Sequence, residues 1–298
     1  MIYLDSFHFP SLEEEENYLS WYFSENPCSM NKLYPFKVLS VKEFYSIDFE
    51  RITLLYGGNG SGKSTALNAI ANKLGVARNS AYNKANKEFY DEYISMCDYE
   101  EGESEEYILD LKDKTTLITS DDIFKYMLDT RQKNGYVNIR RDKVIDDWFD
   151  ARKSRIKHIN FETGEGLDEY KHTKKAKKQT CYQYVSENLG AEVETFSNGE
   201  TGFMRFIEGI VPDRLYLLDE PENSLSCELQ MKLAEYIERS ARYFGCQFII
   251  ATHSPFLLAI QEAKIYDLDS CPVTISKFWE LPNMMLLHNL FKGYDSKF

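Results

Sequence analysis

The stretch Gly57-Gly58-Asn59-Gly60-Ser61-Gly62-Lys63-Ser64 decides the fold of this chain. It matches the phosphate-loop pattern G-x-x-x-x-G-K-[S/T]. The apolar run at 51–56 before it predicts a short buried strand, and apolar residues recur at helical spacing from Leu67 to Leu74 after it. Strand, glycine loop and helix are the context that a true phosphate loop requires, so the sequence predicts a site for a nucleoside triphosphate.

The residue types in this loop fit the chemistry of phosphate binding. Glycines allow successive backbone N–H groups to point at phosphate oxygens, and the dipole of the following helix adds to that field. We expect Lys63 to contact the β- and γ-phosphates and Ser64 to bind Mg²⁺. The residues predicted to bind ATP here are Gly57, Gly58, Asn59, Gly60, Ser61, Gly62, Lys63, Ser64 and Thr65.

Two further apolar strands end in residues suited to hydrolysis. The run 215–218 leads into Asp219 and Glu220, and the run 248–252 leads into His253. One carboxylate can hold the Mg²⁺ shell and the other can deprotonate the attacking water, so Asp219 is the expected metal ligand beside Ser64. Glu220 is the expected catalytic base, and His253 is expected to sense the γ-phosphate from the same sheet edge. The alternation of strands and helices indicates a mainly parallel sheet.

The motif Phe196-Ser197-Asn198-Gly199-Glu200 would be an ordinary turn on its own. Taken in order with the loop, the Asp-Glu strand and the histidine, however, it resembles the signature of the ATP-binding cassette (ABC) superfamily. The Ser-x-Gly-Glu variant is similar to that of SMC-like, RecF-like and OLD-like ATPases. This resemblance implies that Ser197, Asn198, Gly199 and Glu200 contact ATP held by a second copy, in a head-to-tail dimer with ATP sandwiched between the subunits.

The chain departs from that family pattern at two places. The family's loop glutamine should follow a strand between the two motifs, but here the strand predicted at 114–120 is followed by Asp121 and Asp122. We assign the glutamine's place to one of these two aspartates. Ser226 stands where many relatives have an aspartate, so communication between subunits is expected to differ.

The resemblance implies an α/β fold of the ABC-type P-loop NTPases. We expect a single domain over 1–298, with a mainly parallel central sheet, antiparallel amino-terminal strands and a helical lid and signature subdomain inserted at 121–200. A transporter subunit is disfavoured because the coupling glutamine is missing. The 134 residues that separate Lys63 from Ser197 are too few for SMC-like arms, and the 45 residues after His253 exclude an OLD-like fused nuclease. The remaining resemblance is to small stand-alone AAA-type bacterial ATPases, whose relatives act in DNA repair and anti-phage defence.

Composition bears on partners and compartment. The net charge of −13 disfavours unspecific nucleic-acid binding by the whole chain, yet the segment 131–178 carries 14 Lys/Arg against 8 Asp/Glu. That segment is either a contact surface for DNA or a separate effector protein, or a solvated helical lid. Six scattered cysteines without a C-x-x-C pair indicate reduced thiols. With no signal peptide and no membrane span in the sequence, we expect a cytoplasmic protein.

Two functional hypotheses follow. One is a Mg²⁺-dependent ATPase that switches conformation on DNA or an effector protein. The other is a very slow or non-catalytic ATP-sensing scaffold.

The residue that stacks on the adenine base stays open between Tyr34 and Phe36. Elsewhere, the sequence predicts an acidic helical segment that begins at 12–17 and one or two strands at 36–49. It also predicts solvated surface or a flexible connection over most of 79–110, and a packing role for 279–291.

Overall fold

The computed structural model contains a mixed α/β unit and a second, separate unit. The described residues are 1–25, 33–76, 87–102, 110–123, 125, 143–144, 146–148, 150–151, 167–178, 184, 203, 206–207, 209–223 and 225–295. The chain separates into one compact unit of residues 1–124 with 198–298 and another of residues 125–197. The single domain expected over 1–298 and the lid expected at 121–200 stay predictions.

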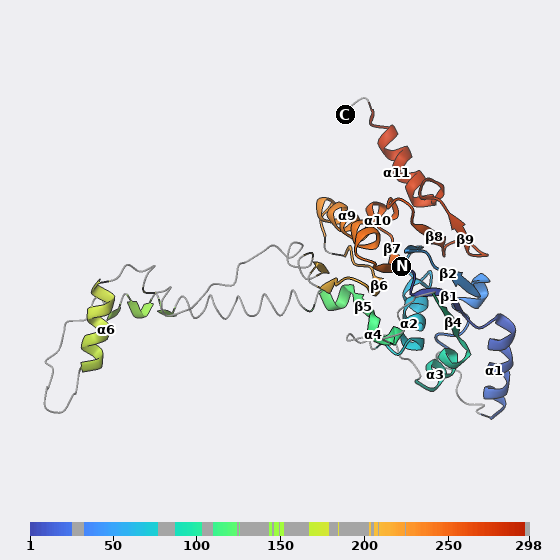
Figure 1. Ribbon diagram of the computed structural model, residues 1–298, viewed down its shortest axis with the longest axis horizontal. Coiled ribbons are helices and arrows are strands. Elements are labelled where there is room, and N and C mark those ends of the chain that lie inside the picture. Colours follow the sequence, from blue (N-terminus) through green and yellow to red (C-terminus); the bar gives the residue numbers. More distant parts are fainter. Residues whose placement is uncertain are drawn as a thin grey trace. The chain divides into compact units, whose positions relative to one another are not determined.

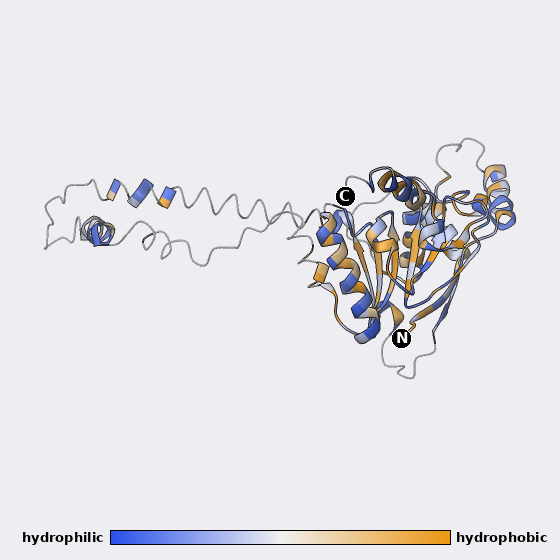
Figure 2. Ribbon diagram, turned by 90° about the horizontal axis from the view of Figure 1, so that it is seen from above, coloured by the Kyte–Doolittle hydropathy of each residue, from blue (hydrophilic) through white to orange (hydrophobic). Residues whose placement is uncertain are grey.

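The central feature of the first unit is a six-stranded sheet in the order β5-β6-β7-β3-β8-β9 (Figure 1). Its first five strands run parallel, and β9 pairs antiparallel with β8. The strands are β3 (Ile52–Tyr56), β5 (Thr115–Thr119), β6 (Leu215–Asp219), β7 (Gln247–Thr252), β8 (Lys264–Asp267) and β9 (Thr274–Ser276). Every residue of β3, β6 and β7 is buried, as expected for parallel strands covered on both faces. The apolar strands appear orange in Figure 2.

A second, three-stranded antiparallel sheet has the order β2-β1-β4. Its strands are β1 (Leu4–His8), β2 (Ser46–Asp48) and β4 (Asp98–Glu101). The buried amide of Gln247 on β7 joins it to the parallel sheet: Oε1 accepts from the backbone N–H groups of Tyr3 (2.8 Å) and Leu4 (2.9 Å), and Nε2 donates to the carbonyl of Leu4 (2.8 Å). The mainly parallel sheet with antiparallel amino-terminal strands is therefore confirmed.

Helix α2 (Lys63–Lys73) follows the glycine loop and is enclosed by protein. Eight of its 11 residues are buried, and its apolar side chains share one core with both sheets. Helix α9 (Cys227–Tyr243) packs on β7 and on the short α10 (Pro255–Leu258), with Leu233, Ile237 and Ala241 on its buried face. Helix α1 (Leu12–Glu25) confirms the acidic helix predicted near the amino terminus.

The prediction of solvated surface over most of 79–110 was wrong for its central part. Helix α3 (Lys87–Met96) and β4 lie there, followed by α4 (Leu111–Lys114). Phe89, Tyr90 and Tyr93 are buried, and the Phe89 ring lies 4.5 Å from that of Tyr22. The segment is rich in acidic residues, but it also carries aromatic side chains at helical spacing. The free energy gained by burying these aromatic side chains stabilises the helix despite the polar composition of the segment.

Two smaller expectations concern short segments. The segment 36–49 forms a 3₁₀ turn, η1 (Ser40–Lys42), and one strand, β2, which agrees with the one or two strands expected there; Leu39 and Phe44 enter the core from irregular backbone. The packing role of 279–291 holds for Leu281 and Met284. However, Trp279 of η2 (Phe278–Glu280) and most apolar residues of α11 (Pro282–Lys292) are exposed.

In the second unit the structure describes α6 (Leu167–Lys178) and parts of its surroundings. Ala176 on α6 packs with Trp148, Ala151 and Tyr184 in a small core of their own, and the Tyr184 hydroxyl lies 2.6 Å from Nε2 of His172. The exposed positions of α6 are mostly lysines, so the helix has one narrow packing face and a basic remainder.

Candidate nucleotide site

The glycine loop joins the carboxyl end of β3 to α2, as the sequence predicted. Gly62 is the N-cap of α2 at φ 103°, and a Cβ there would lie 2.9 Å from Cδ2 of Leu39, so both conformation and space require glycine. A cavity of about 450 Å³ opens over the loop. It is lined by Tyr34, Val38, Asn59, Gly60, Ser61, Gly62, Lys63, Ser64, Thr65 and Glu220.

Lys63 is buried, and its ammonium group is turned toward its own loop. Nζ donates to the carbonyls of Gly57 (2.7 Å) and Gly58 (3.0 Å), and it lies 3.7 Å from Oε1 of Glu220. The charge is thus balanced by two carbonyl dipoles and one carboxylate, which lowers the cost of burying it. Phosphate oxygens of a bound nucleotide could replace these partners of the ammonium group.

Ser64 and Asp219 come together at the mouth of the loop. Ser64 Oγ donates to Oδ1 of Asp219 (2.8 Å), the last residue of β6, whose side chain is buried. A hydroxyl and a carboxylate oxygen are the ligand types that Mg²⁺ prefers beside nucleotide phosphates. The buried Oγ of Ser61 has no hydrogen-bond partner in the described part of the chain, an orphaned polar atom that a bound phosphate oxygen would satisfy. The donor set therefore fits Mg²⁺ with a nucleotide.

Glu220 occupies an unusual backbone conformation directly after Asp219. Its φ is 50°, a left-handed conformation that costs a non-glycine residue on the order of 1 to 3 kcal/mol. The backbone N–H of Glu220 donates to the carbonyl of Ala251 (2.9 Å) on the neighbouring strand. Its Oε2 accepts from Nδ2 of Asn223 (3.0 Å), and its Oε1 lies 3.6 Å from Nδ1 of His253. The carboxylate is thus aimed between the loop lysine and the histidine.

Glu222 is a functional residue that the sequence analysis did not single out. It is buried, and its Oε1 accepts from the Thr252 hydroxyl (2.6 Å) and from the backbone N–H groups of His253 (3.1 Å) and Ser254 (3.2 Å). One carboxylate oxygen therefore fixes the turn that presents His253. Its position two residues after Glu220 was the available signal, but its contacts lie on a strand 30 residues away.

Burial raises the pKa of Glu222 above its ordinary value of 4.5, against the opposing effect of the hydrogen bonds from the Thr252 hydroxyl and the His253 backbone and of the nearby His253 charge. Its second oxygen, Oε2, is buried without a hydrogen-bond partner in the described residues. Desolvation therefore favours the protonated form of a group that holds two strand ends together.

The two aromatic candidates for the adenine contact have different surroundings. Phe36 is in the core, where its ring stacks on Tyr18 at 5.3 Å, so it does not face the nucleotide cavity. Tyr34 lines the cavity, its hydroxyl donates to Oγ1 of Thr65 (3.4 Å), and its ring lies 6.4 Å from that of Tyr90. Tyr34 is the remaining candidate.

The aspartates assigned to the place of the family's glutamine follow β5, which pairs with β6 so that Thr119 lies opposite Asp219. Asp122 Oδ2 accepts from the backbone N–H (3.2 Å) and the hydroxyl (2.7 Å) of Thr119, a reciprocal cap of the helix that starts there. Asp122 is thus engaged with Thr119, and the assignment of the glutamine's place to Asp121 or Asp122 stays a prediction.

Two further parts of the family pattern are the signature motif and the position of Ser226. Ser197, Asn198, Gly199 and Glu200 lie outside the described residues. Ser226 is the N-cap of α9, with its Oγ accepting from the backbone N–H of Leu229 (3.4 Å). Serine and aspartate cap helices about equally well, which explains how serine replaces the family's usual residue without loss of the helix start.

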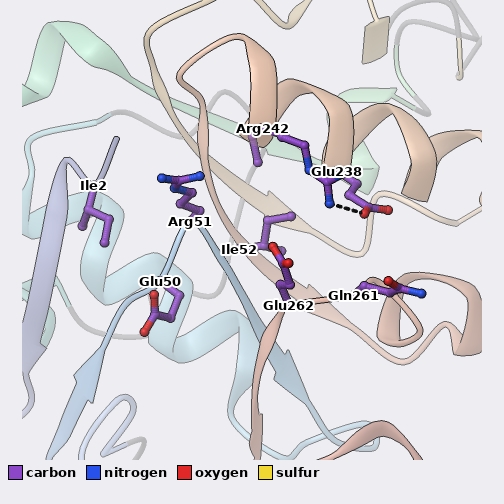
Figure 3. A pocket seen from close by; sticks show the side chains of 9 residues that line it. Ile2, Glu50, Arg51, Ile52, Glu238, Arg242, Gln261 and Glu262 are labelled. Atoms are coloured by element: carbon purple, nitrogen blue, oxygen red, sulfur yellow. Dashed lines mark hydrogen bonds and ion pairs between the residues drawn. The ribbon is translucent and has the colours of Figure 1, made fainter.

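A second cavity, of about 370 Å³, lies at the amino end of β3 (Figure 3). Arg51 and Arg242 line it together with three glutamates. Arg242 donates to Glu238 at 3.1 Å, an ion pair drawn as a dashed line in Figure 3. Ligands of parallel sheets bind at the carboxyl ends of strands, where glycine loops and helix N-termini converge. The mixed charges and location of this second cavity do not fit a triphosphate.

Comparison with known families matches both halves of the site. Residues 38–88, which contain the glycine loop, match a family described as "P-loop containing region of AAA domain". Residues 202–259, which contain Asp219, Glu220 and His253, match "AAA domain, putative AbiEii toxin, Type IV TA system". A search of curated proteins found no match for the chain.

Several solved structures are similar at low identity. The Smc head domain with an extended coiled coil bound to the C-terminal domain of ScpA, from Pyrococcus furiosus, has 16% identity and a TM-score of 0.39, covering 82% of this chain and 94% of that one. The Smc head bound to the C-winged helix domain of ScpA has 15% identity and a TM-score of 0.39, covering 80% and 94%. A nucleotide-free ATP-binding cassette from an ABC transporter has 12% identity and a TM-score of 0.38, covering 80% and 89%.

The glycine loop and the strand order define a P-loop α/β fold, and the two matched families identify AAA-type segments at 38–88 and 202–259. The resemblance to AAA-type P-loop ATPases predicted from the sequence is therefore confirmed. Among the described helices, none combines the length and the apolar composition needed to cross a bilayer.

Proposed function

We propose that this chain binds Mg²⁺-ATP in the glycine-loop cavity and hydrolyses it. The observation that carries the proposal is the convergence of Lys63, Ser64, Asp219, Glu220 and His253 on one sheet edge, although they come from three separate strand ends. A direct test measures ATP binding and single-turnover hydrolysis for the wild type and for Lys63→Ala. Loss of both in the variant supports the proposal, and wild-type protein that neither binds nor hydrolyses ATP would contradict it.

Each residue of the site has a defined part in the proposed reaction. Ser64 and Asp219 would hold Mg²⁺, which neutralises charge on the phosphates. Glu220 accepts the proton of the attacking water, and Asn223 keeps its carboxylate in place. His253, fixed by Glu222, faces the same space and donates to the γ-phosphate. No covalent intermediate with the protein is needed, because positioning and charge carry phosphoryl transfer.

The proposal includes an ATP-dependent dimer. The resemblance implies that Ser197 and Gly199 of one copy contact ATP held by the other, which would make ATP the link between subunits. Glu220→Gln keeps the side-chain shape and removes the base, so it is expected to accumulate as an ATP-bound dimer in light-scattering measurements. The matched control is the double variant Lys63→Ala/Glu220→Gln. An ATP-independent mass in Glu220→Gln would reject the dimer.

Hydrolysis that is undetectable while ATP binding and dimerisation persist would instead support the alternative, an ATP-sensing scaffold. Stable association with an integral membrane protein would be required for a third function, the nucleotide-binding subunit of a transporter.

We propose a cytoplasmic location, where ATP is available and thiols stay reduced. Cys97, Cys227, Cys246 and Cys271 are free.

We further propose that the dimer acts on DNA or on an effector protein, as in DNA repair or anti-phage defence. The support is helix α6, which exposes Lys171, Lys174, Lys175, Lys177 and Lys178. If these lysines contact DNA phosphates, double-stranded DNA should stimulate hydrolysis with a steep salt dependence. Lys174→Glu/Lys178→Glu should abolish that stimulation, while the control Lys232→Glu on α9 should not. An unchanged rate with DNA would favour a protein effector.

A further inference from the structure

Asp269 contacts the phosphate loop directly, a contact that the glycine-loop motif does not include. The backbone N–H of Gly58 donates to both carboxylate oxygens of Asp269, at 3.0 Å to Oδ1 and 2.9 Å to Oδ2. Asp269 comes from a distant part of the chain, two residues beyond the end of β8, and reaches the first limb of the loop from the outside.

The position of Asp269 is fixed by its own segment. Its backbone N–H donates to Oδ1 of the buried Asp267 (2.9 Å), and the N–H of Leu268 donates to the carbonyl of Tyr56 (2.9 Å). The second bond continues the β3–β8 pairing, in which Tyr56 lies opposite Asp267, by one residue beyond the end of β8. Lys42 Nζ donates to the carbonyl of Leu268. These hydrogen bonds therefore fix the turn that carries the Asp269 carboxylate.

Lys63 binds the other side of the same peptide group. The carbonyl of Gly57 and the N–H of Gly58 belong to one peptide unit, and Lys63 Nζ donates to that carbonyl at 2.7 Å. The unit thus lies between a cation and an anion, ammonium at its oxygen and carboxylate at its hydrogen. Charge-assisted hydrogen bonds at both ends of one peptide polarise it in the same sense, so each bond strengthens the other.

The start of the loop, at Gly57 and Gly58, is tightly packed, so its backbone has little room to move. A Cβ at Gly57 would lie 2.5 Å from Oγ of Ser61 and 3.2 Å from Oδ1 of Asp269, so the start of the loop is packed between the loop's own serine and Asp269. A rotation of the first peptide would displace Ser61 and the N–H groups that follow it. The orientation of the first peptide thereby affects the shape of the whole phosphate cradle.

We propose that Asp269 is a positioning residue for nucleotide binding: it fixes the Gly57–Gly58 peptide so that the loop keeps its open shape and Lys63 is held ready at its carbonyls. When phosphates draw Lys63 away, the bond from Gly58 to Asp269 keeps the first limb in place. This inference deepens the proposed function and rests on it, because its effect on binding presupposes that the loop takes ATP.

The first test compares Asp269→Ala with Asp269→Asn. Alanine leaves the Gly58 N–H without an acceptor, so we expect ATP affinity to fall about tenfold, the size expected for one charge-assisted hydrogen bond. Asparagine keeps a carbonyl acceptor and should restore most of the affinity. The rate at saturating ATP should change less than twofold in both, since Asp269 touches no reacting atom. Asp295→Ala, which removes an exposed carboxylate elsewhere, is the control and should match the wild type.

A second readout needs no nucleotide. Amide hydrogen exchange of the peptide that contains Gly58 should be faster in Asp269→Ala than in the wild type and intermediate in Asp269→Asn. Equal exchange and equal ATP affinity in all variants would overturn the inference. A fall in both saturated rate and thermal stability, without rescue by asparagine, would also overturn it, because it indicates a general structural role. If wild type and Lys63→Ala bind ATP equally poorly while Gly58 exchange still depends on Asp269, the proposed function fails and the contact stands.

Discussion

At the residue scale, the site depends on carboxylates that differ in their surroundings rather than in their type. Asp219 and Glu220 are adjacent in sequence, yet Asp219 accepts a hydrogen bond from the Ser64 hydroxyl while Glu220 is turned by its left-handed backbone toward Lys63 and His253. Glu222, two positions further, is withdrawn from solvent and holds the backbone at His253. Three acidic side chains within four positions thus have three separate tasks.

The buried Glu222 makes stability depend on pH. Its pKa is raised by burial, so the folded protein retains this proton to a higher pH than the unfolded chain does. Its contribution to the free energy of unfolding is therefore full below about pH 4.5 and is lost as the pH rises through the folded-state pKa. Glu222→Gln cannot titrate and keeps the Oε1 acceptor, so its stability relative to the wild type should increase across that window.

Urea unfolding at several pH values between about pH 5 and pH 8 measures this effect. Glu235→Gln, an exposed change on α9, is the control and should follow the wild-type pH profile. Parallel profiles for Glu222→Gln and the wild type would show that the proton on Glu222 has no part in stability.

At the scale of elements, prediction from the sequence succeeded where a pattern is local and repeated. The buried strands that lead to Asp219 and His253, the loop and α2 follow from runs of apolar residues ending in polar ones. The contacts of Asp269 and Glu222 could not be predicted, because they join segments that only the parallel pairing of β3, β6, β7 and β8 brings together. Helix α3 was missed because its acidic neighbours hide a short aromatic face.

Helix α3 provides a test at this scale. Phe89 is buried against Tyr22 and Phe36, so Phe89→Ala should lower the free energy of unfolding by about 3–5 kcal/mol. The exposed change Asp91→Ala on the same helix should stay within about 0.5 kcal/mol of the wild type. Equilibrium urea unfolding compares the two, and similar small losses would mean that α3 does not belong to the core.

At the scale of the whole molecule, packing and side-chain hydrogen bonds connect the two sheets of the ATPase unit: Tyr266 on β8 bonds to the backbone of Asp48 on β2, and Gln247 on β7 bonds to the backbone at β1. Gln247 Oε1 accepts from the backbone N–H groups of Tyr3 and Leu4. Its Nε2 donates to the carbonyls of Leu4 and of Glu50 (3.2 Å). Gln247→Leu has similar volume but leaves these buried groups unpaired. We expect a loss of about 3 kcal/mol or more in the free energy of unfolding, measured by urea or heat.

The control for that change is Gln261→Leu, because Gln261 is exposed and has no such network. If the two variants were equally stable, the hydrogen bonds of Gln247 would make no net contribution to joining the sheets.

This amide also limits how the ATPase unit can deform. Sliding one sheet across the other would require breaking a set of short hydrogen bonds at once, inside a region that water does not reach. We therefore expect the two sheets to move together rather than to slide past each other. A change at the glycine loop should then also reach the amino-terminal strands, so the outer face of β2-β1-β4 is expected to respond to the state of the loop.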